Sequence, residues 1–330
     1  RPAARTTNRS SDPSLRKGAP MKRALLCLLL LIACVGTSFA EPVRLERRYE
    51  PGHRTTTRRT MHTDQTLFIA GMEVLTNVDQ DLVASSVNGD RAADGTLDVT
   101  ETIDAMHVTM ELPQGLSFEC HSADPDHETD DSQLDFLSEA FRAVVGMSWV
   151  MVVGADGRIT EVRVNEDPGS SLSPMAKDVL EGQFNPDMLR TAANQDLERL
   201  PDDPVDVGDF WQRRQTMALG GGQTMDLTYQ YEYVGTVEDG GRTLDKVTAT
   251  VTQVALEMEP GAQSPAQVTE SDLEVESSEG YFLFDREQGT TVRFDGSFHV
   301  VGELTIAVAG QELPTDLDLT IEVEAVTEET

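Results

Sequence analysis

The strongest constraint on the fold is a run of alternating residues from Met225 to Tyr233. Apolar or aromatic side chains occupy every second position, and polar side chains occupy the positions between them. Successive residues of a β-strand point to opposite faces, so this period predicts a strand with one buried and one solvated face. A glycine pair at Gly240-Gly241 separates this run from a second apolar run. Residues 208–259 are therefore predicted to contain a β-hairpin with long arms.

An earlier stretch of the chain repeats this pattern. A glycine precedes a methionine by nine positions in both places, Gly52 to Met61 and Gly208 to Met217. In the earlier stretch, residues 67–87 are predicted to form one arm of a hairpin. We interpret the two stretches as an internal duplication.

A change of apolar phase supports this interpretation. Apolar residues move from odd to even positions between Ile103 and Met106, and again between Val251 and Val254. One extra residue in a strand turns every later side chain to the opposite face. A β-bulge is therefore predicted in each stretch.

Helices are predicted in two places. Ser173-Pro174 and Asn185-Pro186 each combine a capping residue with proline at the first helical position. Another helix is predicted from Ser132, where apolar residues recur at helical spacing. Pro201 and Pro204 end the second segment and form a linker.

The predicted fold class is mainly β (β-rich α+β). Its architecture is a long antiparallel curved sheet or half-barrel, built from two related halves with a small helical insert. The expected segments are a non-structural extension (1–20), a signal peptide (21–40), a first β-rich half (43–168), a helical insert and linker (169–204), a second β-rich half (205–326) and an acidic tail (327–330).

The segment from Met21 to Ala40 has the pattern of a secretory signal. Lys22-Arg23 precede a short apolar run, and small residues precede Glu41. This order favours cleavage after Ala40 and a periplasmic or secreted location. As an alternative, Cys34 lies in a sequence that fits a bacterial lipoprotein box, which would make the protein a lipid-anchored lipoprotein. Attachment to a membrane is expected only in that case.

The chain is strongly acidic, with a formal net charge of −32. Cleavage after Ala40 would remove seven basic residues and one acidic residue, which leaves about −38. Such a surface repels polyanions, so no nucleic-acid partner is expected. Cys120 would be the one remaining cysteine, so a disulfide framework within the mature chain is excluded.

The sequence contains no recognisable catalytic motif. Nucleophile elbows, His-Glu-x-x-His motifs, phosphate-binding loops and dinucleotide fingerprints are missing from it. Cys120 and His121 are neighbours on a predicted strand, so their side chains would point to opposite faces. No catalytic residue is predicted and no cofactor is expected. A hydrolase with an unrecognised acid or histidine site is a minor alternative.

One acidic turn resembles a calcium-binding loop. Its candidate ligands are spaced partly as in an EF-hand, but Ala92 stands where an oxygen donor belongs and the flanks are predicted strands. The main interpretation is an acidic hairpin turn, with a weak Ca²⁺ site as the alternative. The candidate ligands are Asp90, Asp94, Asp98 and Glu101.

Methionines at inward-facing strand positions are candidates for an apolar binding surface. Methionine adapts to irregular apolar partners, although it is also ordinary core filler. The candidates are Met72, Met106, Met110, Met147, Met151, Met225 and Met258.

Several short stretches resemble a bacterial secreted β-rich family described only as a domain of unknown function. They are Pro204 with 208–211, the segment 278–285, and Val301-Gly302-Glu303-Leu304. The resemblance covers most of residues 43–326 and implies no activity. The architecture is also similar at the level of the fold to lipoprotein-carrier-like half-barrels.

Three functions follow as hypotheses. The first is an extracytoplasmic, non-catalytic protein that holds an apolar or lipid-like ligand on a concave β surface. The second is a structural component of the cell envelope or a partner of an envelope protein. The third is the hydrolase described above.

Overall fold

The fold was analysed in a computed structural model, which describes residues 41–122, 134–165, 172–220, 223–258, 266–308 and 311–330. All helices and strands described below belong to the unit Pro42–Thr330. The predicted extension and signal peptide lie outside the described residues, as do Cys34 and Ser132.

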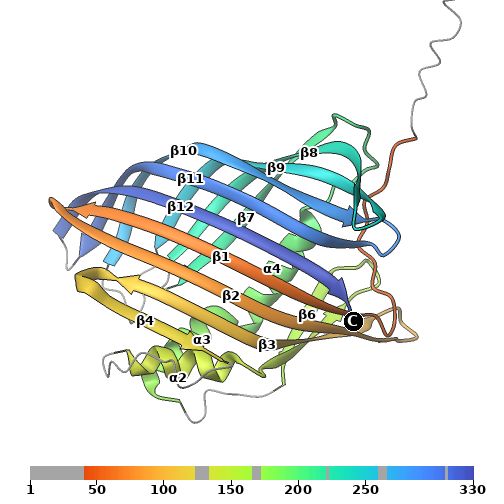
Figure 1. The fold of residues 1–330 in the computed structure, drawn as a ribbon, viewed down its shortest axis with the longest axis horizontal. Coiled ribbons are helices and arrows are strands. Elements are labelled where there is room, and N and C mark those ends of the chain that lie inside the picture. The colour runs from red at the N-terminus through yellow and green to blue at the C-terminus, as the bar shows by residue number, and fades with distance from the viewer. Residues whose placement is uncertain (1–40, 123–133, 166–171, 221–222, 259–265, 309–310) are drawn as a thin grey trace, which may run out of the picture. The chain divides into compact units, whose positions relative to one another are not determined.

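Twelve antiparallel strands form one curved, unclosed sheet (Figure 1). They are β1 (Arg54–Ile69), β2 (Met72–Arg91), β3 (Leu97–Leu112), β4 (Leu116–His121), β5 (Ser148–Val153), β6 (Ile159–Val164), β7 (Phe210–Gly220), β8 (Gln223–Asp239), β9 (Arg242–Met258), β10 (Ala266–Asp285), β11 (Thr290–Val308) and β12 (Gln311–Glu329). The order is β6-β5-β3-β2-β1-β12-β11-β10-β9-β8-β7, and β4 pairs with β3 beside this path. The predicted β-rich half-barrel is confirmed.

Pairing of β1 with β12 joins the two ends of the described chain at the middle of the sheet. Thr55 is opposite Glu329, so β12 continues through most of the predicted acidic tail. The threonine-rich β1 supplies partners for those last residues, which is why the tail is strand rather than a free end.

The predicted arm at residues 67–87 contains a turn that sequence analysis missed. Ala70 and Gly71 both have positive φ, 52° and 82°, and they join β1 to β2 directly. Two residues of this conformation match the twist of a tight hairpin. Alanine is uncommon there, because its Cβ crowds the left-handed region.

Three α-helices are described: α2 (Asp135–Val144), α3 (Pro174–Phe184) and α4 (Pro186–Glu198). A short 3-10 turn, η1 (Pro113–Gly115), joins β3 to β4. The side chains of Ser173 and Asn185 accept hydrogen bonds from backbone N–H groups of the first turns of α3 and α4, at 3.3 and 2.9 Å. Both predicted helix starts are therefore confirmed. The chain passes through α3 and α4 between the two edge strands of the sheet, β6 and β7.

Apolar side chains on the inner face of the sheet form two main cores. In the first, α2, α3 and α4 pack against β3, β4, β5 and β6, with Val108 and Phe118 each 1% exposed. In the second, β8 and β9 pack against β11 and β12, with Val300 0% and Leu319 1% exposed. A smaller cluster around Phe282 extends the second core. The period-two alternation supplies the apolar face of each strand.

The predicted bulges are confirmed. In β3, Ala105 and Ile103 pair with consecutive residues of β2, so Asp104 is the extra residue. In β9, Val251 and Gln253 pair with consecutive residues of β8, so Thr252 is the extra residue. Each bulge falls at the predicted change of phase.

Equivalent backbone hydrogen bonds occur at the start of β1 and of β7. The N–H of Gly52 donates to Asn88, whose N–H donates to His53. In the same way, the N–H of Gly208 donates to Tyr233, whose N–H donates to Asp209. The units β1–β2–β3 and β7–β8–β9 thus share local geometry, and their common origin stays a prediction.

Candidate functional site

The inner faces of β1 and β2 carry apolar residues that contact both main cores. Met61 and Leu67 contact the core formed by β8, β9, β11 and β12. Val78 and Leu82 contact the core covered by helices. All four side chains are only half-buried. We call these four residues the inner stripe.

Arg59 lies at one end of the inner stripe. It pairs with Leu82 across the β1–β2 ladder and with Ala325 of β12, which places it on the inner face. Arg59 is exposed, although its neighbours on this face are half-buried. The inner surface of β1 and β2 therefore combines an apolar stripe with an accessible cation.

Beyond Arg59, an N-terminal segment covers the polar end of β1 and β2. This segment, residues 42–53, is named the strap. Val43 and Val205 exchange two backbone hydrogen bonds of 2.8 Å, and the N–H of Arg48 donates to Gly289 at 2.9 Å. Leu45 is 2% exposed. The strap therefore belongs as much to the second half of the chain as to the first, in which sequence analysis placed it.

Gly289 allows the strap to approach the β10–β11 turn closely. Its φ is +67°, and a Cβ built there would lie 2.5 Å from Cγ of Arg48. A residue with a side chain would have to displace Arg48 and adopt a left-handed backbone conformation.

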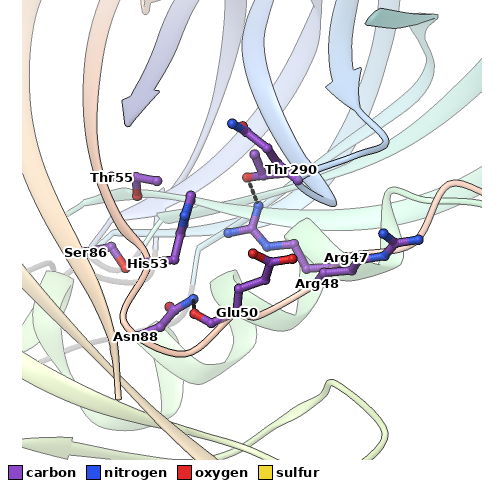
Figure 2. Close-up of a pocket in the computed structure, with 9 residues that line it drawn as sticks. Arg47, Arg48, Glu50, His53, Thr55, Ser86, Asn88 and Thr290 are labelled. Carbon is purple, nitrogen blue, oxygen red and sulfur yellow. Dashed lines mark hydrogen bonds between the residues drawn. The ribbon is translucent and has the colours of Figure 1, made fainter. Parts of the chain in front are cut away.

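A polar pocket lies where the strap meets the sheet (Figure 2). Arg47 donates to Thr290 Oγ1, and the side-chain amide of Asn88 donates to the backbone carbonyl of Glu50 at 2.9 Å. The cavity volume is about 20 Å³, which is room for about one water molecule. Its lining residues are Arg47, Arg48, Glu50, His53, Thr55, Ser86, Asn88, Gln288 and Thr290. This pocket is too small for an organic ligand.

Glu101 has the most strongly perturbed carboxyl group on the inner face. Burial raises its pKa to about 7, and the negative charge of Asp196 on α4 raises it further. Arg47, a hydrogen bond from Trp149 and the charge of Arg59 act in the opposite direction. Near neutral pH this carboxyl group therefore exchanges between its protonated and ionised forms.

Asp196 also pairs with Arg199, whose guanidinium lies 2.8 Å from its carboxylate. The same guanidinium stacks over Phe294 of β11, with 5.0 Å between Cζ and the ring centroid. The Nε atom of Arg199 is buried, and no described residue forms a hydrogen bond with it. Sequence analysis missed the surroundings of Glu101 because the residues come from separate parts of the chain, and no regular spacing connects them. They are Arg47 of the strap, Glu101, Trp149, Asp196, Arg199 and Phe294.

The structure does not bring the four candidate calcium ligands together. Asp94 accepts hydrogen bonds from Thr96, and these lower its pKa. Asp98 is on the outer face, 3.1 Å from Arg163, whereas Glu101 is on the inner face of the same strand. Asp90 is exposed near the end of β2. In the described part of the chain, no group of three His, Cys, Asp or Glu side chains is positioned to hold a metal ion. Calcium binding stays a prediction, and a calcium titration tests it.

The candidate methionines fall into separate places. Met106, Met147 and Met151 are buried in the helix-covered core, and Met110 is half-buried against it. Met225 is buried in the second core. Met72 is 65% exposed at the tip of the β1–β2 hairpin, and Met258 ends β9 opposite Gln223. The half-buried methionine of the inner stripe, Met61, was not among the candidates.

Cys120 is 4% exposed, and burial raises the pKa of its thiol. This keeps the thiol in its protonated, unreactive form. None of the described helices is both long enough and apolar enough to cross a membrane.

A family model described as "Family of unknown function (DUF6263)" matches residues 94–252. The chain resembles a family without an assigned activity. The matched region extends from the turn before β3 into β9 and includes all three described α-helices. No curated protein matches the chain. The predicted resemblance to a family of unknown function is confirmed.

Several solved structures are similar in fold. A lipovitellin structure determined for lipid–protein interactions has 10% identity and a TM-score of 0.41, over 85% of this chain and 25% of that one. The chain thus spans about a quarter of lipovitellin. A DUF1329 family protein from Desulfovibrio piger ATCC 29098 has 11% identity and a TM-score of 0.13, over 82% and 85% of the two chains. A putative outer membrane lipoprotein-sorting protein domain from Vibrio parahaemolyticus has 8% identity and a TM-score of 0.11, over 83% and 85%. At these values the similarities carry no argument about ligands.

Proposed function

We propose that the protein is a non-catalytic binding protein that holds an apolar or lipid-like molecule against the inner stripe. The observation that carries the proposal is the incomplete burial of this stripe between two well-packed cores. Met61, Leu67, Val78 and Leu82 are half-buried, whereas residues of the adjacent cores such as Val300 and Leu319 are 0% and 1% exposed. A bound apolar molecule would remove the remaining apolar surface from water.

The length of the stripe suits an acyl chain. From Met61 to Leu67 a strand extends about 20 Å, at about 3.3 Å for each residue. One leaflet of a bilayer holds its acyl chains within about 15 Å, half of the hydrocarbon thickness. The stripe is therefore long enough for one such chain lying along β1.

Arg59 would meet the polar end of the same molecule. A guanidinium binds carboxylate or phosphate groups through paired hydrogen bonds. The half-buried Gln80, opposite Met61, would offer an amide beside it. The preferred ligand is therefore an amphipathic molecule with an acidic head group.

Native mass spectrometry of protein purified without detergent is the first test. We expect a species heavier than the bare chain, which loses the added mass after organic extraction. The extracted protein should then bind a fluorescent fatty acid. Bare protein that also fails to bind the fatty acid would refute the proposal.

Two adjacent substitutions provide a matched comparison. Leu82 is on the inner face and Val83 on the outer face of β2, and both are half-buried. Leu82→Gln should weaken fatty-acid binding at least tenfold, whereas Val83→Gln should leave it within twofold. Equal affinities for the two variants would place the ligand elsewhere.

A second candidate function, a protein-interaction component of the cell envelope, rests on the tip of the β1–β2 hairpin. Phe68, Met72 and Leu75 are 42%, 65% and 56% exposed there. Exposed apolar groups of this kind are typical of contact sites. Phe68→Ser with Leu75→Ser should then abolish cross-linking to a partner and leave fatty-acid binding unchanged. Unchanged cross-linking would count against this function.

We also propose an extracytoplasmic location, in the periplasm or outside the cell, on the basis of residues 21–40. Cell fractionation tests this location. Labelling with a radioactive fatty acid, in the natural chain and in Cys34→Ala, distinguishes lipidation at Cys34 from simple cleavage. A cytoplasmic protein without lipid would overturn both alternatives.

A further inference from the structure

Histidines on the outer face of the sheet lie beside carboxylates of neighbouring strands. His62 of β1 is 2.6 Å from Asp79 and 2.9 Å from Asp64, through its two ring nitrogens. His299 of β11 is 2.8 Å from both Glu276 and Asp318. At these two places, each ring nitrogen faces a different carboxylate, so the carboxylates lie on opposite sides of the ring.

His107 of β3 has a different environment, because it faces a second histidine. It is directly opposite His121 of β4 in the antiparallel ladder, and the two ring centroids are 4.7 Å apart. Glu119, two residues before His121 and on the same face, has its carboxylate 3.2 Å from Nε2 of His107. Thr109 Oγ1 is 3.5 Å from the same nitrogen.

The two imidazole rings are about as close as in a tetrahedral metal complex. With metal–ligand bonds of about 2.0–2.1 Å, such a complex places the centroids of two bound imidazole rings about 5 Å apart. The observed separation of the ring centroids is 4.7 Å. The 3.2 Å between Glu119 and Nε2 of His107 is a hydrogen-bond distance, which places the carboxylate within reach of the same ring.

We propose that His107 and His121 bind one divalent transition-metal ion, such as Zn²⁺ or Cu²⁺, with Glu119 as the third ligand. Imidazole nitrogen is a preferred donor for both ions. Nitrogen donors select these ions over Ca²⁺ and Mg²⁺, which take oxygen ligands. A water molecule completes the tetrahedron around zinc.

The three ligands do not have their final positions before the metal binds. Glu119 now interacts with Nε2 of His107, and it must rotate to share the metal with that nitrogen. In their present positions, no three of the described His, Cys, Asp and Glu side chains could hold a metal ion, so the proposed site requires this rotation. Asp81 is 3.9 Å from Nδ1 of His107 and is placed to orient the ring from its other side. The acidic surface raises the local concentration of cations around the site.

A bound metal would fasten β4 to the sheet. β4 pairs with β3 and lies off the main path of the sheet. His121 is its last residue, and only Ser122 separates it from residues 123–133, which lie outside the described part of the chain. A metal between His107 and His121 would therefore hold the end of β4 against β3 and stabilise the folded state by mass action.

The test is a competition titration of the full-length protein with Zn²⁺ against a chromophoric chelator, at physiological ionic strength. We expect one site per chain. His107→Gln and His121→Gln should each weaken it by more than tenfold, and Glu119→Gln by about tenfold. His62→Gln and His299→Gln are the matched controls, because both histidines have carboxylate neighbours without a second histidine, and they should bind as the natural chain does.

Electron paramagnetic resonance of the Cu²⁺ complex gives an independent measurement. Coupling to two imidazole nitrogens is expected in the natural chain, and coupling to one in His107→Gln or His121→Gln. Circular dichroism in the presence of a chelator checks that the variants are folded. Binding that is equally strong in all five variants would show adsorption to the acidic surface only, and would overturn the proposal. So would the lack of any bound zinc in the natural chain.

Discussion

Glu101→Gln should make the protein less sensitive to pH between about 4.5 and 7. Burial raises the pKa of Glu101 from its ordinary value of 4.5 to about 7 in the folded protein. Glutamine has nearly the shape of protonated glutamic acid and cannot ionise. The substitution therefore keeps the favoured neutral form and removes the cost of burying a charge.

The sign follows from proton binding. In this pH window the folded protein holds the Glu101 proton more tightly than the unfolded chain does, so stability contributed by this group falls as pH rises. The contribution is fully present below the unfolded pKa and is lost as pH rises through the folded pKa. A shift from 4.5 to about 7 corresponds to about 3 kcal/mol at high pH, at about 1.4 kcal/mol for each pKa unit.

The assay is urea denaturation of both proteins at pH 4, 6 and 8. At pH 4 the free energies of unfolding should agree within about 0.5 kcal/mol, whereas at pH 8 the variant should be more stable by about 2–3 kcal/mol. Glu111→Gln, at an exposed position of the same strand, is the control and should change stability by less than about 0.5 kcal/mol at each pH. A difference that does not vary with pH would refute the assigned environment of Glu101.

Two further substitutions test other parts of the structure. Gly289→Ala should destabilise the fold by about 1–3 kcal/mol, because alanine at positive φ is strained and its Cβ collides with Arg48; an unchanged midpoint in urea would contradict this contact. Asp245→Ala should cost about 2–3 kcal/mol, because Asp245 is 2% exposed, accepts a hydrogen bond from Tyr233 and lies 2.6 and 2.7 Å from the guanidinium of the partly exposed Arg286. A thermal midpoint within 1 °C of the natural protein would show that these contacts do not stabilise the fold.

Much of the strand structure was predictable because its causes are local. The alternation from Met225 to Tyr233 became β8, and the changes of phase became bulges at Asp104 and Thr252. A bulge leaves a direct trace in the sequence, since it reverses which positions are apolar. Helix starts at Ser173 and Asn185 were predictable for a similar reason, because capping needs only neighbouring residues.

The candidate binding surface was less predictable. Four of the candidate methionines belong to the helix-covered core rather than to an open surface. Sequence alternation predicts that a residue faces inward, but it does not predict what packs against that residue. The incomplete burial of the inner stripe depends on how far the two cores extend over β1 and β2, which the sequence does not show. In the same way, His107 and His121 are fourteen residues apart and meet only through the β3–β4 register.

The amino-acid order by itself determined many of the strands and their apolar faces, the bulges of β3 and β9, and how acidic the chain is. These properties depend on side-chain chemistry within a few neighbouring residues. The tertiary structure alone decided that β1 pairs with β12, that the strap crosses to the second half, and that Glu101 meets charges from α4 and residues 42–53. The pairing of strands and the pKa of a buried side chain depend on contacts between residues far apart in the chain. A pattern among neighbouring residues does not predict those contacts.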